Sequence, residues 1–190
     1  MSEQQTYPRA PETAVERLTE FKGPDLHDLS DAADAAIEDG GGFGWLAPPP
    51  RQVMETYWRG VLLVPERELF VARLDGVIAG SAQLASPPAN NEAGRHSGTL
   101  STFFLAPWAR GRGLAAMLVQ EVERAARDAG LRILNLDVRQ SQTRAIEVYE
   151  ELGFQRWGSH PRYVFVDGAW MSGHFYFKDL SEAEEIEAGA

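Results

Sequence analysis

The stretch Pro107-Trp108-Ala109-Arg110-Gly111-Arg112-Gly113-Leu114-Ala115 decides how the rest of this 190-residue chain is arranged. It follows an apolar, β-prone run at residues 100–105 and precedes a run whose apolar residues recur every three or four positions, as on one helix face. Those residues are Leu114, Leu118, Val122, Ala125 and Ala129. Gly130 then stands where a left-handed residue commonly ends a helix. The sequence therefore predicts a strand, a tight turn and a long helix.

The predicted turn has the features of an anion-binding site. A helix N-terminus presents unpaired backbone N–H groups and a partial positive charge, and Gly111 and Gly113 would let a bulky anion approach them. Arg110 or Arg112 could add a charge-assisted hydrogen bond; the alternative is a glycine-softened turn with solvated arginines. A dinucleotide-binding fold is disfavoured, because Ala116 replaces the third glycine of its motif and antiparallel hairpins flank the turn.

Two motifs in the same order resemble those of the GNAT superfamily of acyl-CoA-dependent N-acetyltransferases. Arg110-x-x-Gly113-x-Ala115 fits the family pattern of Gln or Arg, then Gly, then Gly or Ala. Downstream, Ala145-x-x-x-Tyr149-x-x-x-Gly153-Phe154 matches the segment that follows the family's next strand. The resemblance covers roughly residues 70–180, and each motif reinforces the other.

The resemblance implies an enzyme that transfers the acetyl group of acetyl-CoA directly to a primary amine. Tyr149 would act as the general acid toward the coenzyme thiolate, since a phenol is protonated at neutral pH. A backbone N–H near Phe104 or Leu105 would donate to the developing oxyanion, and Gln142 stands where the family often has asparagine. The residues assigned to coenzyme binding are Phe104, Leu105, Arg110, Gly111, Arg112, Gly113, Leu114, Ala115, Gln142 and Arg144.

The pattern along the chain predicts an α/β fold of the α+β kind, with a mixed central sheet and helices on both faces. Antiparallel N-terminal strands, a central right-handed βαβ unit and a C-terminal hairpin would form the sheet. Asp75-Gly76 and Asp167-Gly168 are strong signals for hairpin turns. The predicted strands are 14–21, 68–74, 77–84, 100–105, 133–138, 163–166 and 169–177, and the predicted helices are 25–39, 50–61, 113–129 and 145–152.

The length of the chain favours one domain. We expect a flexible N-terminal lead at residues 1–12, a single domain at 13–180 and an acidic tail at 181–190. The N-terminus lacks the basic-then-apolar order of a secretory signal, and no stretch has the apolar length of a membrane span. The expected location is therefore the cytoplasm.

Composition narrows the range of ligands. The chain has no cysteine and four scattered histidines, so we expect no metal site and no covalent enzyme intermediate. The formal net charge of −10 opposes long-range attraction to nucleic acid or an anionic membrane. An acidic surface can attract a cationic acceptor, or it can simply keep the protein soluble.

The general base is not obvious from the sequence. Many members of the family use a carboxylate on or near the central strand, but residues 98–105 contain none. His96 and Glu92 lie just upstream, and a histidine can accept a proton near neutral pH; either residue could equally be an exposed bystander. A non-catalytic acyl-CoA-binding or sensing domain is therefore a second hypothesis.

The acceptor site is expected near residues 40–50, because in the family the loop between the first two helices borders it. Phe43 and Trp45 could wall the substrate pocket, or they could only anchor the loop to the core. A small-molecule amine is the expected acceptor, with a protein or peptide N-terminus as the alternative. A homodimer is also left open.

Overall fold

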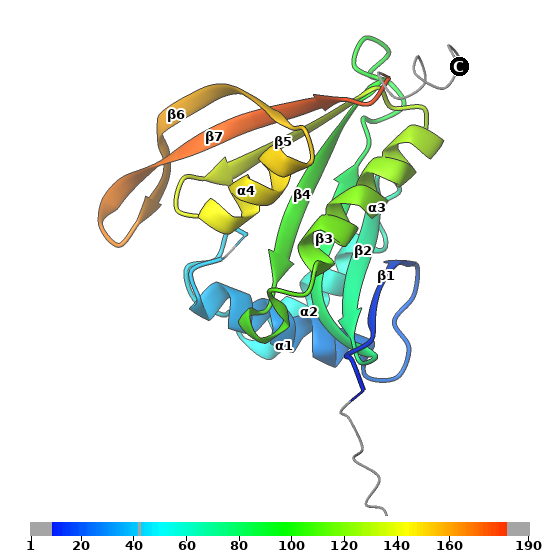
Figure 1. Cartoon of the computed structure of the whole chain (residues 1–190), viewed down its shortest axis with the longest axis vertical. Helices are drawn as coiled ribbons and strands as arrows, with labels where there is room; N and C mark the ends of the chain where they lie inside the picture. The colour runs from blue at the N-terminus through cyan, green and yellow to red at the C-terminus, as the bar shows by residue number, and fades with distance from the viewer. Residues whose placement is uncertain (1–8, 42, 182–190) are drawn as a thin grey trace, which may run out of the picture.

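The structure is a computed structural model that describes residues 9–41 and 43–181. These residues form seven strands and four α-helices, with a short 3₁₀ helix, η1 (Pro107–Ala109), before the third α-helix (Figure 1). The strands are β1 (Thr13–Leu18), β2 (Arg67–Leu74), β3 (Val77–Ala85), β4 (Ser97–Leu105), β5 (Ile133–Arg139), β6 (Gln155–Val166) and β7 (Ala169–Asp179). The helices are α1 (Asp25–Glu38), α2 (Arg51–Val61), α3 (Leu114–Asp128) and α4 (Thr143–Glu151).

The strands form one sheet in the order β1-β2-β3-β4-β5-β7-β6. All neighbours are antiparallel except β4 and β5, which are parallel and are joined by the crossover through α3. This is the predicted mixed sheet with antiparallel N-terminal strands, a central βαβ unit and a C-terminal hairpin.

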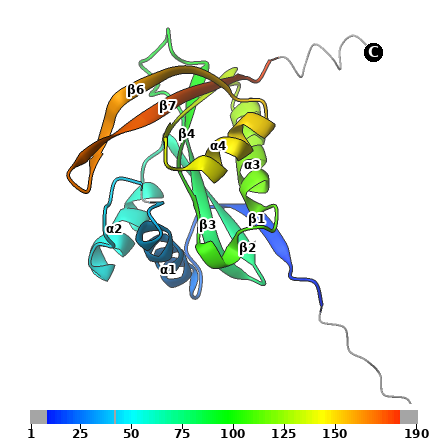
Figure 2. The same cartoon turned by 60° about the vertical axis from the view of Figure 1, so that its left-hand side comes forward.

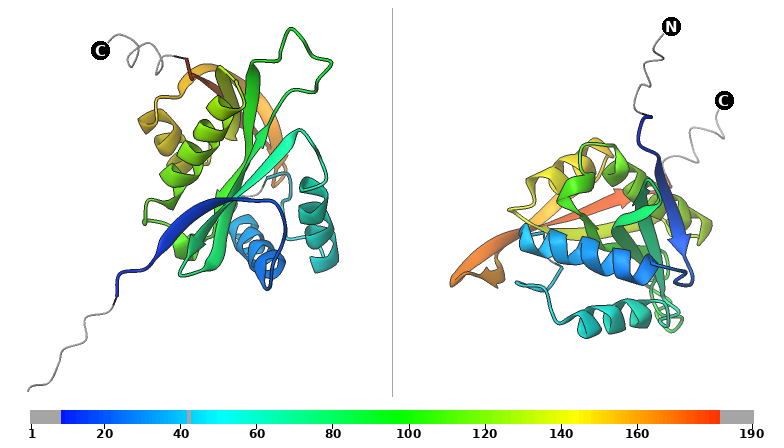
Figure 3. Two further views of the ribbon diagram at one scale, coloured as in Figure 1. Left: turned by 90° about the vertical axis from the view of Figure 1, so that its right-hand side faces the viewer. Right: turned by 90° about the horizontal axis from the view of Figure 1, so that it is seen from below.

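Helices cover both faces of the sheet, as Figures 2 and 3 show. On one face, Leu114, Leu118 and Val122 of α3 pack with Tyr149 of α4 in one core cluster. On the other face, a second cluster joins α1 and α2 to the N-terminal strands, with Trp58 fully buried. Burial of these apolar faces is the main term that stabilises such a fold.

Both predicted Asp-Gly turns are confirmed. Asp75 and Gly76 have φ values of 50° and 85°, and Asp167 and Gly168 have φ values of 50° and 77°. A two-residue hairpin turn with positive φ at both positions matches the right-handed twist of its strands. These turns close the β2–β3 and β6–β7 hairpins.

The predicted boundaries are wrong for the first strand of the sheet and for the first strand of the C-terminal hairpin. The first strand ends at Leu18 instead of residue 21, and β6 begins at Gln155, eight positions before the predicted start. Most side chains in the first half of β6 are exposed, and the strand lies at the edge of the sheet. With no buried face there is no apolar alternation to detect.

A bulge and a separation of strands distinguish the centre of the sheet. Thr102 has a φ of +50°, and the β3–β4 register shifts beside it. The parallel pairing of β4 with β5 involves three residues on each strand, from Ser97 to Thr99 and from Ile133 to Asn135. Beyond these pairs the strands diverge, so one edge of β4 is open at its C-terminal half.

Only some of the residues in the predicted terminal segments are described by the structure. The domain predicted at 13–180 spans all elements from β1 to β7. The predicted flexible lead at 1–12 lies outside the described residues apart from 9–12, and the predicted acidic tail at 181–190 lies outside them apart from Ser181.

Candidate active site

A cavity of about 510 Å³ lies between α3 and α4, above the open half of β4. The end of α1 closes one side of it through Ala36 and Asp39, and the turn before α3 closes another. The coenzyme-binding residues predicted from the sequence that line it are Phe104, Leu105, Arg110, Gly111, Gly113, Leu114, Ala115, Gln142 and Arg144. The structure thus brings nine of the ten together.

The turn before α3 is shaped to receive an anion. Gly111 and Gly113 have φ values of 74° and 78°, which L side chains rarely adopt. No side chain caps α3, and within the described part of the chain the backbone N–H groups of residues 111–116 donate to no protein acceptor. Unpaired N–H groups at a helix N-terminus fit a phosphate, so the turn fits the diphosphate of a coenzyme.

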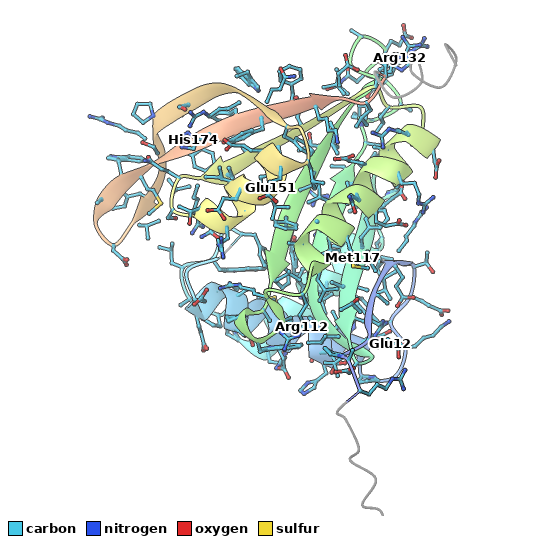
Figure 4. All side chains as sticks on the ribbon, in the orientation of Figure 1. Glu12, Arg112, Met117, Arg132, Glu151 and His174 are labelled. Carbon is cyan, nitrogen blue, oxygen red and sulfur yellow. The ribbon has the colours of Figure 1, made fainter. Side chains whose placement is uncertain are left out.

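The two arginines of the turn differ in position. Arg110 lines the cavity, where its guanidinium contacts Asp39 Oδ2 at 2.5 Å and the carbonyl of Leu105 at 3.3 Å. Arg112 lies on the turn before α3 (Figure 4) but does not line the cavity. Its guanidinium donates to the carbonyls of Trp108 and Arg110. Its predicted role in coenzyme binding is therefore not supported by its position, because the hydrogen bonds hold it against the outside of the turn.

The N-terminus of α4 forms the opposite wall of the cavity. Gln142 lies at its N-cap, and its side-chain amide donates to the carbonyl of Gly40 at 2.8 Å. Arg144 also lines the cavity, and its guanidinium donates to Glu147 Oε2 at 2.6 Å. This hydrogen bond raises the pKa of Arg144 above its ordinary value. Gln142 thus ties α4 to the end of α1.

A second cavity, of about 330 Å³, adjoins the first. Four residues line both cavities: Gly41, Phe103, Gln142 and Ala145. The second cavity extends between the diverging strands β4 and β5 toward β6. Two ligands bound in these cavities would meet beside Phe103.

Tyr149 reaches the second cavity from α4. Its side chain is buried and packs against Phe103, with ring centroids 5.4 Å apart. Burial raises its pKa far above the ordinary value near 10, and the charge of Asp137 adds to the shift. The phenol therefore keeps its proton at every physiological pH. Within the described residues it has no hydrogen-bond partner, unlike the hydroxyls of Tyr163 and Tyr176.

Asp137, on β5, is a carboxylate in the second cavity that the sequence reasoning missed. Asp137 accepts a hydrogen bond from Tyr163, which also lines that cavity. Burial is the main cause that raises the pKa of Tyr163, and this hydrogen bond is the second. The general base was expected on or just before β4, whereas residues 137–139 of β5 line the same opening. The signal was an acidic residue between Leu136 and Val138, two buried residues of an apolar strand.

His96 and Glu92 are not brought to the site. Neither lines either cavity. His96 precedes the first residue of β4, at the end of the strand opposite the open half, where Nδ1 lies 3.1 Å from the carbonyl of Gly130 and Nε2 accepts a hydrogen bond from Arg95. A role for these residues as base is therefore not supported, because a base must be within hydrogen-bond reach of the amine or of one bridging water.

Phe43 and Trp45 have different surroundings. Phe43 lines the second cavity and stacks on Phe104, with centroids 5.1 Å apart. Trp45 lines neither cavity and makes edge contacts with Phe43 and Tyr57 at 5.4 Å and 5.2 Å. A ligand in the second cavity could therefore contact Phe43 directly, whereas Trp45 only packs against Phe43 outside the cavity.

Other kinds of site find no support in the described part of the chain. Residues 9–41 and 43–181 contain no group of three His, Cys, Asp or Glu side chains that could hold a metal ion. None of the helices in those segments is both long and apolar enough to cross a membrane.

Comparison with known proteins identifies the family. The model of the acetyltransferase (GNAT) family matches residues 29–154. An uncharacterised N-acetyltransferase from the hisH-hisA intergenic region of Azospirillum brasilense is 62% identical over 133 residues, which are 70% of this chain and 79% of that protein.

Solved structures share the fold at low sequence identity. The structure of yncA from Salmonella typhimurium, with its cofactor acetyl-CoA, has a TM-score of 0.71 and 16% identity, over 90% of this chain and 95% of that one. A GNAT superfamily phosphinothricin acetyltransferase from Sinorhizobium meliloti, in complex with AcCoA, has a TM-score of 0.69 and 19% identity, over 88% of each chain. The chain therefore belongs to the acetyltransferase (GNAT) family.

Proposed function

We propose that this acetyltransferase transfers the acetyl group of acetyl-CoA directly to the primary amine of a small molecule. The observation that carries the proposal is the pair of adjoining cavities, one with an anion-binding turn and one with a carboxylate and a buried phenol. Each cavity has a size that suits a small ligand. Because the cavities meet at the opening between β4 and β5, both substrates could be bound at once, and no covalent enzyme intermediate is needed.

The first cavity would hold the coenzyme. The unpaired N–H groups of residues 111–116 and the guanidinium of Arg110 would bind its diphosphate. Acetyl-CoA would supply the thioester whose C–S bond breaks as the new C–N bond forms. A backbone N–H of Phe104 or Leu105, on the open half of β4, would donate to the acetyl carbonyl oxygen as that oxygen gains negative charge.

Residues of the second cavity would accept and donate the protons of the reaction. An amine attacks only as the neutral form, so its ammonium proton must leave, and Asp137 would accept it directly or through one water. Tyr149 would then donate to the departing sulfur. Its raised pKa makes it a weak acid, so its contribution would be a hydrogen bond to the thiolate as well as proton donation. The products are the N-acetyl amine and the free thiol.

The experiment that tests this function measures thiol release from acetyl-CoA with and without primary amines. Calorimetry should show acetyl-CoA binding that Gly113→Asp abolishes, since the new carboxylate would face the diphosphate. Gly130→Asp is the matched control, because Gly130 has nearly the same φ, 75° against 78°, and lies at the other end of α3. Binding without thiol release for any amine would instead support the acyl-CoA-sensing alternative.

The cytoplasmic location that the sequence leads us to expect, and the homodimer that the sequence leaves open, stay proposals. Fractionation of the cells that make the protein would test the location.

A further inference from the structure

Two opposite charges lie on one face of β5 inside the second cavity. Asp137 and Arg139 are two positions apart, so both side chains project from the same side of the strand, and both line the cavity. No ion pair joins them, and the Asp137 carboxylate instead accepts a hydrogen bond from Tyr163. Same-face positions on a strand are separated by about 7 Å, which leaves room for a small ligand between the two charged groups.

Arg139 has no charge partner in the described part of the chain. No hydrogen bond or ion pair of its guanidinium is found there, although Arg110 and Arg144, which line the first cavity, each contact a carboxylate. Its positive charge opposes the upward shift of the Tyr163 pKa, which places the guanidinium near that phenol. An unpaired guanidinium in a small cavity is suited to bidentate binding of a carboxylate.

The rest of the cavity is suited to a small, partly apolar molecule. Apolar residues from β4, from β6 and from the loop after α1 also line it: Phe43, Leu100, Phe103 and Val164. Ser101 also lines the cavity, and its buried Oγ has no hydrogen-bond partner. A buried hydroxyl of this kind gains stability from a polar ligand group.

We propose that the acceptor is a small amine that also carries a carboxylate close to the amino group, as a free α-amino acid does. Its amino group lies at Asp137 and its carboxylate at Arg139, while its side chain lies against the apolar wall. This inference rests on the proposed function, because it gives the class of acceptor for the same site. A peptide N-terminus is disfavoured, since its α-carboxyl group is an amide and carries no charge.

The test compares each amino acid with two analogues that lack the charged carboxylate. Leucine, methionine, phenylalanine and glutamate are each paired with their amide and with the amine formed by decarboxylation. Calorimetry is run with free CoA present, so that binding is measured without acetyl transfer, and thiol release from acetyl-CoA is measured in parallel. At least one amino acid should bind roughly tenfold or more tightly than both of its analogues, as a charge-assisted bidentate contact implies.

Arg139→Gln should bring that ratio close to one and leave the affinity for acetyl-CoA unchanged. Arg156→Gln is the matched control, because Arg156 is an exposed arginine on β6 that lines neither cavity, and it should keep the ratio. Equal binding of all three forms in every set, or an unchanged ratio in Arg139→Gln, would overturn the inference. Tighter binding of the amides would support a peptide acceptor in its place.

The two proposals fail in different ways. If several amines are acetylated but the carboxylate makes no difference, the proposed function stands and the amino-acid acceptor is wrong. If an amino acid binds through Arg139 but no thiol is released with any amine, the binding site is correct and the transferase function for these acceptors is wrong.

Discussion

At the scale of single residues, one substitution tests the proposed role of Asp137 as the general base. Asp137→Asn keeps the shape and the hydrogen bond from Tyr163 but cannot accept the amine proton. We expect kcat/KM for the acceptor to fall by about 10²–10⁴, the usual contribution of a general base, with acetyl-CoA affinity nearly constant. Steady-state kinetics beside calorimetry checks this. Glu92→Gln is the control and should retain full activity; loss of activity there and not in Asp137→Asn would refute the assignment.

Tyr149 differs from Asp137 in what its removal should change. Tyr149→Phe keeps the packing against Phe103 and removes the proton, so kcat should fall about a hundredfold or more. Burial disfavours the phenolate and raises the pKa, so the proton is retained as pH rises. Wild-type kcat should therefore show no loss from ionisation of this phenol up to pH 10. A decline with a midpoint below 10 that Tyr149→Phe removes would contradict this account.

The contact between Asp39 and Arg110 has a predicted cost for coenzyme binding. Both residues line the first cavity, and the Asp39 carboxylate accepts a hydrogen bond from the Arg110 guanidinium. That donor is therefore not available to the diphosphate while the pair is formed. Asp39→Asn should lower the Kd for acetyl-CoA by about twofold to fivefold, since a half-exposed pair is worth up to roughly 1 kcal/mol. The difference should narrow at high salt.

A matched control for this change exists on α3. Asp128 pairs with Arg124 at 2.7 Å and lies outside both cavities. Asp128→Asn removes one negative charge from the protein and should leave the Kd for acetyl-CoA unchanged. Weaker coenzyme binding in Asp39→Asn would mean that Asp39 orients Arg110 for the diphosphate.

At the scale of elements, the sequence predicted what depends on local pattern. The turn before α3, the apolar face of that helix and both Asp-Gly hairpin turns follow from nearest-neighbour chemistry, and the structure confirms them. The divergence of β4 and β5 depends on packing between distant segments, so no local signal reports it. Asp137 was missed for that reason: its approach to Tyr149 depends on the topology, with β5 beside β4 and α4 above both.

The contact between β7 and α4 gives a prediction at this scale. The buried Tyr176 of β7 donates to Glu150 Oε1 of α4 at 2.8 Å. Tyr176→Phe should lower the free energy of unfolding at pH 8 by about 1 kcal/mol, the usual net worth of such a bond. Urea unfolding followed by circular dichroism measures it. An unchanged free energy would show that the hydrogen bond makes no net contribution.

The same tyrosine should make stability depend on alkaline pH. Burial, then the hydrogen bond to Glu150, raises the pKa of Tyr176 to about 12, whereas the phenol of an unfolded chain has a pKa near 10. Below pH 10 both states keep the proton and the contribution is fully present. Between pH 10 and 12 the unfolded state ionises first, so stability is lost as pH rises. Tyr176→Phe should reduce this alkaline loss.

At the scale of the whole molecule, the proposed coenzyme site and the proposed acceptor site depend on different features of the fold. The coenzyme side uses a turn and helix ends whose motif can be read from the sequence. The proposed acceptor site uses β5, β6 and the loop after α1, which meet only in the folded chain. The motifs therefore do not predict the class of acceptor, and the proposed amino-acid acceptor depends on the placement of Asp137 and Arg139 in the folded chain.

The hairpin of β6 and β7 predicts that two copies of the chain associate. Its outer end projects beyond the rest of the molecule (Figure 3), and Trp157, Phe165 and Trp170 are 66%, 54% and 55% exposed. Exposed apolar clusters of this kind commonly mark interaction surfaces. Residues 155–179 of the hairpin carry three basic and two acidic side chains in a chain with a net charge of −10, so repulsion between two copies is small there.

Light scattering after gel filtration should therefore give twice the monomer mass for the wild type and the monomer mass for Phe165→Ser/Trp170→Ser. These two rings contact each other, with centroids 5.2 Å apart, and line neither cavity, so circular dichroism and acetyl-CoA affinity should be unchanged in the variant. Val53→Ser is the control, because Val53 is an apolar side chain that is 48% exposed on α2, and α2 packs against β2, which is separated from the hairpin by three strands of the sheet. It should remain dimeric. A monomeric wild type, or a dimer that survives the double substitution, would show that this surface does not join two copies.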